Sequence, residues 1–266
     1  KLCFMESTLS YITSLLYLLS AILIWLLMMS SRAAKTLQIF VWTFWLSAII
    51  VHSYQLSPIL KDSYSDNLSL DYALILVAFI ISITLYISSI LGNTQFLGII
   101  ILPIGSFIFL LSFENNPVNV SLNNYIFIHV ILSLISYSIL GLSAAQSLIV
   151  KLQEKKLQTN KPLGIITKLP SLDSMDRLLF KLLVLGVVFL SASLISGLIF
   201  IEDLFAQHLA HKTVLSILAW FIFILLILGR KIYGWRGRNA ANINLIGFFF
   251  LFLSYFGTKT VLELIL

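Results

Sequence analysis

Runs of about 20 predominantly apolar residues recur along this chain, and their length constrains the fold more than any other feature. As an α-helix, each run is long enough to cross about 30 Å of bilayer hydrocarbon. Hydrophobic residues make up 59% of the chain and charged residues only 11%. The sequence therefore predicts an all-α, polytopic transmembrane helical bundle that forms a single transmembrane domain over residues 1–266. We expect eight spans, at roughly 8–29, 37–58, 71–91, 95–113, 122–150, 176–200, 212–229 and 242–262.

Lysine and arginine are unevenly distributed between the two sets of loops that these spans create. Of the 17 basic residues, 13 fall in one set, whereas Lys1, Lys61, Lys212 and Lys259 fall in the other. Because basic residues remain in cytoplasmic loops, we expect the first set to face the cytoplasm and both termini to face the outer, periplasmic side. The formal charge of +6 therefore reflects topology, and nucleic acid is not an expected partner.

Outside the spans, the sequence offers little that predicts chemistry. The lysine-rich stretch 151–175 is expected to form a cytoplasmic basic connector that is too short for a separate domain. No GxxxxGK[ST] phosphate loop, GxGxxG or HExxH motif occurs in the chain. Cys3 is its only cysteine, which excludes an intrachain disulfide or a thiol-exchange pair. Since no nucleophile or acid–base pair stands out, we do not expect an enzyme.

Two histidines lie inside apolar spans, His52 in the second and His129 in the fifth. At 1.5 Å per residue from a cytoplasmic entry near Leu37, His52 lies about 22 Å into the bilayer, towards its outer leaflet. His129 is only a few residues from the outer start of its span, so the two rings are expected at similar depth. A polar stripe of Ser133, Ser136 and Tyr137 follows His129 at helical spacing and should face protein or a cavity.

These residues also have simpler explanations. A histidine near the end of a span is often an interfacial hydrogen-bonding residue, and serine and tyrosine commonly join helices. His208 and His211 lie in the loop expected before the seventh span, where solvated side chains are the rule. Tryptophans near span ends, Trp220 among them, most simply form aromatic belts.

Several motifs in order along the chain resemble the cytochrome c assembly family, the CcsA and CcmC type of haem-handling membrane proteins. They are VHSYQL at 51–56, IHVILSLISYSILGLSAAQSL at 128–148, HKTVLSILAW at 211–220, GWRGR at 234–238 and SYFG at 254–257. The pattern is most similar to the YpjD-type inner membrane branch and covers nearly the whole chain. The resemblance implies a multi-pass protein of the bacterial inner (plasma) membrane.

The resemblance also implies haem b bound near the outer face and handed to other cytochrome assembly or membrane proteins. Its axial histidine carries over to His129, with His52 as the expected second ligand across the bundle and His211 as the next candidate. These histidines make imidazole the expected iron ligand. Lys212, on the same side of the membrane, is the candidate partner of a haem propionate, and Trp220 belongs to the same matched stretch.

The chain departs from the family pattern at three places. The family's WxWD loop is replaced here by residues 207–210, Gln-His-Leu-Ala. A histidine of the family's equivalent of the seventh span is Leu228 in this chain. The family's second outer histidine follows the last span, at or past Leu266. We therefore expect His52, His208 or His211 to supply the missing ligand, unless the scaffold is retained without that chemistry.

Two further functions fit the sequence. A transporter of protons or of a small solute could use His52, Asp71 and the serine stripe, because intramembrane polar residues often mark such paths. An accessory scaffold without haem could instead dock a partner through the basic stretch between the fifth and sixth spans. Haem absorbance distinguishes both from a haem-binding protein.

Overall fold

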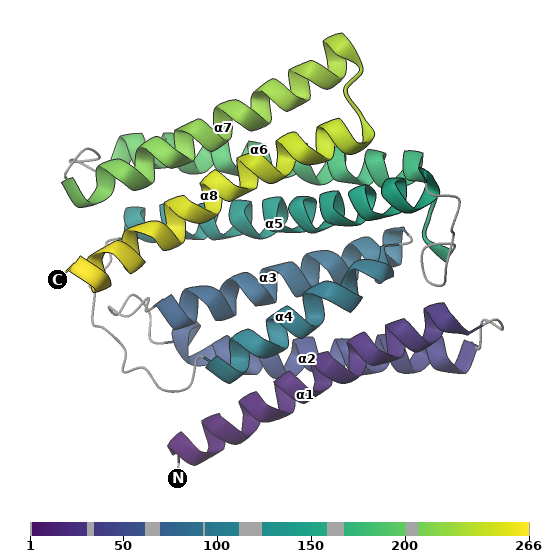
Figure 1. The fold of residues 1–266 in the computed structure, drawn as a ribbon. Coiled ribbons are helices and arrows are strands. Elements are labelled where there is room, and N and C mark those ends of the chain that lie inside the picture. The colour runs from purple at the N-terminus through teal and green to yellow at the C-terminus, as the bar shows by residue number, and fades with distance from the viewer. Residues whose placement is uncertain are drawn as a thin grey trace. The chain divides into compact units, whose positions relative to one another are not determined.

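The computed structural model describes residues 2–30, 35–61, 70–92, 94–111, 124–158, 168–200 and 207–265. These residues are helical almost throughout and contain no strand (Figure 1). The prediction of an all-α polytopic bundle is confirmed. The elements are α1 (Leu2–Met29), α2 (Lys35–Lys61), α3 (Leu70–Leu91), the 3-10 turn η1 (Gln95–Leu97), α4 (Gly98–Leu111), α5 (Asn124–Gln158), α6 (Leu172–Phe200), α7 (Gln207–Tyr233) and α8 (Gly237–Ile265).

Five of these helices contain a stretch that is long and apolar enough to cross a membrane. The stretches are Thr8–Met29, Lys35–Leu56, Phe127–Gln158, Leu172–Ile199 and Lys212–Tyr233. Two shorter apolar helices, Leu74–Ile90 and Gln95–Leu110, lie within the third and fourth predicted spans. The fourth span differs most from expectation, because it opens as η1 and continues as a 14-residue helix with Pro103 inside it. The eighth predicted span falls within α8, whose side chains are described only as far as Ser254.

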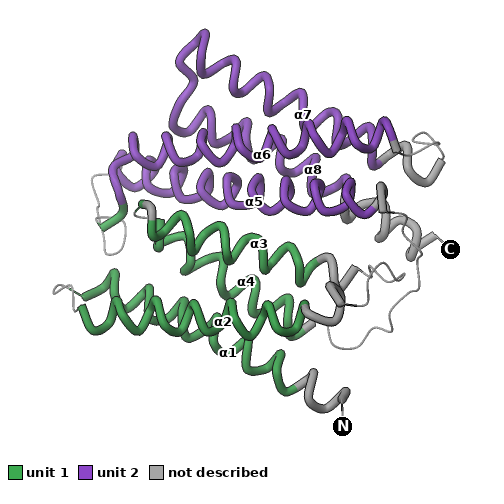
Figure 2. Tube along the Cα trace, turned by 180° about the vertical axis from the view of Figure 1, so that it is seen from behind, with its two compact units in different colours: residues 1–123, 163–169 green, residues 124–162, 170–266 purple. Residues whose placement is uncertain are grey.

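The contacts divide the chain into two compact units, each of which is described by itself (Figure 2). Unit 1 comprises residues 1–123 and 163–169, and unit 2 comprises residues 124–162 and 170–266. The single domain over 1–266 therefore stays a prediction, as does the cytoplasmic placement of the connector 151–175. The first residues of that connector, up to Gln158, continue helix α5.

Unit 1 is held together by polar contacts set among apolar helix faces. Helix α1 packs against α2 and α4, and α3 packs against α4. The Thr13 hydroxyl lies 3.0 Å from Gln55 Oε1, and the Ser14 and Ser106 hydroxyls lie 2.7 Å apart. Between α2 and α3, Trp45 Nε1 donates to Ser82 Oγ at 3.1 Å. These contacts join helices in the way expected where lipid supplies no hydrogen-bond partner.

In unit 2, α5 packs along α6, and α8 packs against both α5 and α7. Close approach of α5 to α6 requires glycine at position 186, because a Cβ there would lie 2.6 Å from Leu140 Cγ. The Ser136 hydroxyl donates to the carbonyl oxygen of Gly186 at 3.1 Å. On the α8 side, the amide nitrogen of the buried Asn244 donates to Ser143 and Ser147 hydroxyls at 2.9 and 2.8 Å.

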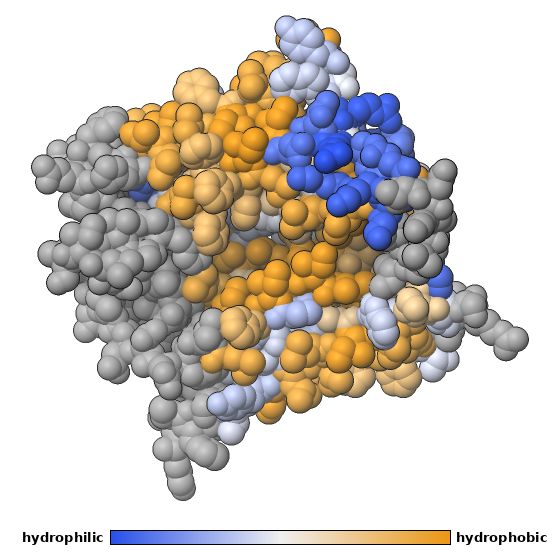
Figure 3. All heavy atoms as spheres, in the orientation of Figure 1, coloured by the Kyte–Doolittle hydropathy of each residue, from blue (hydrophilic) through white to orange (hydrophobic). Residues whose placement is uncertain are grey.

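A buried carboxylate joins three helices at the end of unit 2 where α7 turns into α8. Asp176 of α6 forms an ion pair with Arg230 of α7 and accepts a hydrogen bond from the backbone N–H of Gly237 at 2.9 Å. Gly237 has φ +61°, a left-handed conformation that favours glycine. Hydrophilic residues gather over this end, and apolar side chains cover much of the neighbouring surface in the same view (Figure 3).

We expect Asp176→Ala to lower the free energy of unfolding by about 2 kcal/mol, the typical loss when hydrogen bonds to a charged group are removed. Thermal or SDS-induced unfolding in detergent micelles measures this. The matched control is Asp173→Ala on the same helix, because the Asp173 side chain is 52% exposed against 4% for Asp176. Breaking its exposed pairs with Arg177 and Arg236 should change stability by less than about 1 kcal/mol. Equal effects of the two substitutions would show that Asp176 contributes no more to stability than an exposed carboxylate does.

Candidate functional site

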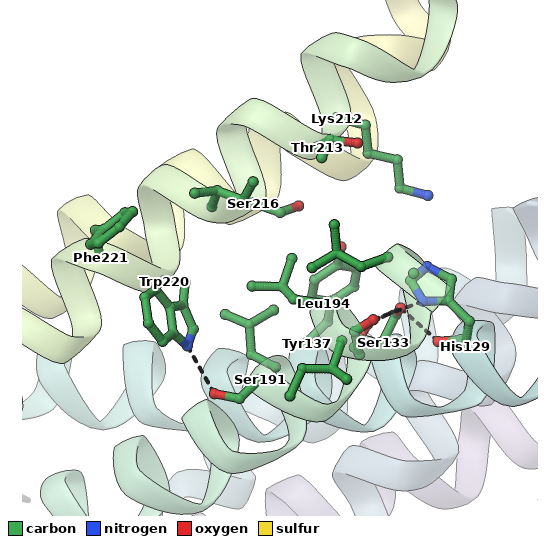
Figure 4. A pocket seen from close by; sticks show the side chains of 16 residues that line it. His129, Ser133, Tyr137, Ser191, Leu194, Lys212, Thr213, Ser216, Trp220 and Phe221 are labelled. Carbon is green, nitrogen blue, oxygen red and sulfur yellow. Dashed lines mark hydrogen bonds between the residues drawn. The ribbon is translucent and has the colours of Figure 1, made fainter. Parts of the chain in front are cut away.

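A cavity of about 310 Å³ lies between α5, α6 and α7 of unit 2 (Figure 4). Its volume is at the lower end of the range of small-molecule sites, about 300–1,000 Å³. Three of the residues singled out by the sequence line it together, namely His129, Lys212 and Trp220. The structure thus brings into one site residues that lie as far apart in sequence as positions 129 and 220.

The two ends of the cavity differ in chemistry. His129 of α5 lies at the same end as Lys212 and Thr213 of α7 (Figure 4). Trp220 and Phe221 lie at the other end, about two helical turns further along α7. Leucine and isoleucine side chains of α6 fill much of the wall between them. The cavity therefore suits an amphipathic ligand with an apolar body and a polar or anionic group.

Hydrogen bonds from α6 orient the His129 ring. His129 Nδ1 lies 2.9 Å from the carbonyl oxygen of Ser193 and 3.0 Å from the hydroxyl of Ser196. Its other ring nitrogen, Nε2, has no hydrogen-bond partner among the described residues. One nitrogen is thus held by the protein, and the other is left available to a ligand.

Other polar groups of the cavity are tied to neighbouring helices. Ser133 Oγ donates to the His129 carbonyl oxygen at 2.8 Å and lies 2.7 Å from Ser193 Oγ. Trp220 Nε1 donates to Ser191 Oγ at 2.8 Å, which fixes the indole at the aromatic end. Of the predicted polar stripe, Ser133 and Tyr137 line the cavity, whereas Ser136 is buried between α5 and α6.

His52 lies in unit 1, in an environment that differs from that of His129. Its Nδ1 is 2.8 Å from the Tyr17 hydroxyl, and its Nε2 is 3.1 Å from the carbonyl oxygen of Ile75. The ring is fully buried, with Phe79 and Phe109 edge-on to it at centroid distances of 4.9 and 4.5 Å. An iron ion bound by His52 would displace one of these two hydrogen bonds. Its pairing with His129, which belongs to the other unit, stays a prediction.

Helix α7 begins earlier than the sequence indicated. It starts at Gln207, so His208 and His211 belong to its first turns and not to the loop that we expected before this span. Their side chains lie outside the described residues, and a ligand role for His211 stays a prediction. Sequence reasoning also missed Ser193, Ser196 and Gly197. Their only signal was a run of small residues, SASLISG at 191–197, in an otherwise bulky apolar helix.

A cluster of three or more metal-ligating side chains is absent from the described part of the chain. Haem needs fewer protein ligands, because the porphyrin supplies four nitrogen ligands and the protein needs to add only one or two. A single histidine in an apolar cavity is compatible with that requirement.

Comparison with known proteins gives a match to the family model of the cytochrome c assembly protein over residues 7–266. The chain is 38% identical to the inner membrane protein YpjD of Escherichia coli K12 over 138 residues, and this alignment covers 52% of each chain. It is 25% identical over 145 residues to the cytochrome c biogenesis protein CcsA of Chlamydomonas reinhardtii, covering 53% of this chain and 39% of that one. It is 28% identical over 134 residues to protein HemX of Brevibacillus brevis, covering 50% and 49%.

These alignments span about half the length of the curated relatives that the chain matches. No solved structure matches the chain.

The two intramembrane histidines should differ in reactivity. We expect diethyl pyrocarbonate to modify His129, whose Nε2 is available at a cavity, and to leave His52 largely unmodified, because both of its ring nitrogens are hydrogen-bonded. Mass spectrometry of the labelled peptides measures the ratio. Protein unfolded in SDS is the control, in which both histidines should react. Equal labelling in the folded protein would contradict the described environments.

Proposed function

Because this chain belongs to the cytochrome c assembly protein family, we propose that it binds haem b in the cavity of unit 2 and supplies it to other proteins of cytochrome assembly. The resemblance read from the sequence is confirmed, including its similarity to the YpjD-type branch. The multi-pass inner membrane location is confirmed as well. Haem binding, action at the outer face and transfer to a partner are the proposed parts.

The available nitrogen of His129 is the observation that carries this proposal. An imidazole that ligates a metal usually donates its other ring N–H to a backbone carbonyl, a carboxylate or water. His129 has this arrangement, with Nδ1 beside the Ser193 carbonyl oxygen at 2.9 Å. When bound, haem would supply an iron centre that accepts an imidazole ligand. His129 would hold the iron through Nε2.

Other side chains of the cavity would contact the porphyrin and a propionate of a haem held by His129. Apolar side chains such as Leu190, Leu194 and Phe221 would exclude water from the porphyrin. Lys212 lies at the His129 end and would attract a propionate. Ile195 and Leu198 line the cavity and are also 57% and 65% exposed, so its α6 wall extends to the outer surface of the helix. Haem is larger than a cavity of about 310 Å³, so it would extend past that wall.

The proposed activity is binding and transfer, not catalysis. No carboxylate or cysteine is present among the residues that line the cavity. The Ser133 hydroxyl proton is directed to a backbone carbonyl within α5, so this group is not set up as a nucleophile. The cavity therefore supports a site that orients a ligand and holds it away from water. Formation of a thioether bond would require groups of a partner protein.

Absorption spectra of detergent-purified protein, oxidised and dithionite-reduced, test haem binding. We expect a Soret band with sharp reduced α and β bands in the wild type, and their loss in His129→Ala. His52→Ala tests the second ligand, because a bis-histidine spectrum should become high-spin if His52 ligates the iron. If His52→Ala keeps the wild-type spectrum, the second ligand of the iron is a group other than His52. A wild type that gains no Soret band on haem addition would overturn the proposal and favour the transporter or scaffold alternative.

Lys212→Gln should weaken haem binding about fivefold, because a partly exposed ion pair contributes about 1 kcal/mol. Haem titration of the apoprotein, followed at the Soret maximum, gives the dissociation constant. Lys231→Gln is the matched control, since Lys231 lies on the same helix but is exposed in its last turn, away from the cavity. Equal haem affinities of Lys212→Gln and the control would show that Lys212 does not contribute to haem binding.

A further inference from the structure

We propose that Ser193, Ser196 and Gly197 of α6 are positioning residues, which hold the His129 ring in the Nδ1–H tautomer and leave its Nε2 lone pair available to the cavity. This inference rests on the proposed function only in naming haem iron as the ligand of that lone pair. The arrangement itself concerns groups that are all present in unit 2.

The hydrogen-bond partners of Nδ1 determine which ring nitrogen carries the proton. The Ser193 carbonyl oxygen, 2.9 Å from Nδ1, can only accept a hydrogen bond. The Ser196 hydroxyl, 3.0 Å from Nδ1, donates its own proton to that same carbonyl at 2.8 Å and so presents lone pairs to the ring. The carbonyl decides the tautomer, because an unprotonated Nδ1 would place its lone pair against the lone pairs of an oxygen only 2.9 Å away. Nδ1 is therefore the donor, and Nε2 of the neutral ring is left without a proton.

Gly197 provides the space that this geometry needs. A Cβ at position 197 would lie 3.0 Å from Cε1 and 3.3 Å from Nδ1 of His129. Contacts this short would push the ring by a few tenths of an ångström away from α6, where both acceptors lie. Glycine thus lets the ring rest directly against the helix backbone, close enough for Nδ1 to reach a carbonyl that is already part of the helix. The three residues occupy one turn of α6 and act on one ring.

The tautomer decides whether the histidine can bind a metal through the nitrogen that has no protein partner. If Nε2 carried the proton, the ring would present an N–H to the cavity and could not donate a lone pair to iron. A neutral histidine in water favours this Nε2–H form, so the α6 contacts must reverse the intrinsic preference. A hydrogen bond from Nδ1–H to a carbonyl also raises the basicity of the ligating nitrogen.

His52 provides a comparison within the same chain. Both of its nitrogens are engaged, one by the Tyr17 hydroxyl and one by the Ile75 carbonyl oxygen. Both ring nitrogens of His52 therefore have partners on other helices. The α6 contacts to His129 involve only one ring nitrogen, Nδ1. The difference between the two rings therefore follows from their partners and not from residue type.

Nitrogen-15 NMR of haem-free protein labelled at histidine tests the tautomer directly, and the chain has only four histidines. We expect His129, assigned by comparison with His129→Gln, to show a protonated Nδ1 and an unprotonated Nε2. In Gly197→Ala, this single tautomer should give way to a mixture or to the Nε2–H form. Ser196→Ala should shift the Nδ1 resonance, and Ser196→Thr, which keeps the hydroxyl, should restore it.

Gly141→Ala is the matched control. Gly141 lies in α5 of the same unit, and a Cβ there would meet the Phe248 ring at 3.6 Å, an ordinary contact. Both substitutions replace a helical glycine and should raise helix propensity by about 1 kcal/mol, so each variant is expected to fold. The control should keep the wild-type tautomer. An Nε2–H tautomer in the wild type, or identical histidine spectra for Gly197→Ala and Gly141→Ala, would overturn the inference.

Haem titration of the same variants tests the consequence for ligand binding. Loss of a group that orients a metal-binding histidine typically weakens metal affinity about 10- to 100-fold, and we expect this for Gly197→Ala but not for Gly141→Ala. An altered tautomer with unchanged haem affinity would overturn the positioning role. If the wild type binds no haem at all, the proposed function fails, whereas the NMR result still decides whether α6 fixes the tautomer.

Discussion

The absence of water from bilayer hydrocarbon is the constraint on which the rest of this structure depends. Backbone groups must be hydrogen-bonded within each spanning segment, which accounts for helices of 22 residues or more in seven of the eight α-helices described. Polar side chains face the same requirement and find partners on other helices. Ser136 does so at the Gly186 carbonyl, and Asn244 at two serines of α5. These contacts fix how α5, α6 and α8 pack, and they leave the space between α5, α6 and α7 as a cavity.

The two intramembrane histidines meet this constraint in different ways. His52 satisfies both nitrogens within unit 1 and lies among aromatic rings, so its contacts stabilise helix packing. His129 satisfies only Nδ1, through α6, and its second nitrogen remains at a cavity. His129 is half-buried, and the partners of its ring within the described residues all lie on the Nδ1 side. A ligand that supplies an electron-pair acceptor would complete the contacts of the ring, and haem iron meets that requirement.

Lys212 and Trp220 extend the same argument along α7. A helix that presents a cation near one end of a cavity and an indole about two turns later creates a gradient from polar to apolar. A porphyrin with its propionates has the same gradient. The ion pair between Asp176 and Arg230 joins the far end of α7 to α6, outside the cavity. Helix α7 thus lines the cavity along one part of its length and is joined to α6 by an ion pair near its end.

The sequence by itself determined the membrane-spanning helices, because the length of an apolar run sets how it satisfies its backbone in lipid. It also determined the family, through motifs spread in order along the chain, and it singled out His129, Lys212 and Trp220 one by one. Only the tertiary structure placed these three in one cavity and separated the environments of His52 and His129. Only the tertiary structure, too, identified Ser193, Ser196 and Gly197 as partners of a ring 64 to 68 positions earlier in the chain. The physical reason is that the length of an apolar run reports which segments leave water, whereas the partner of a polar group depends on distances across helices that no local pattern encodes.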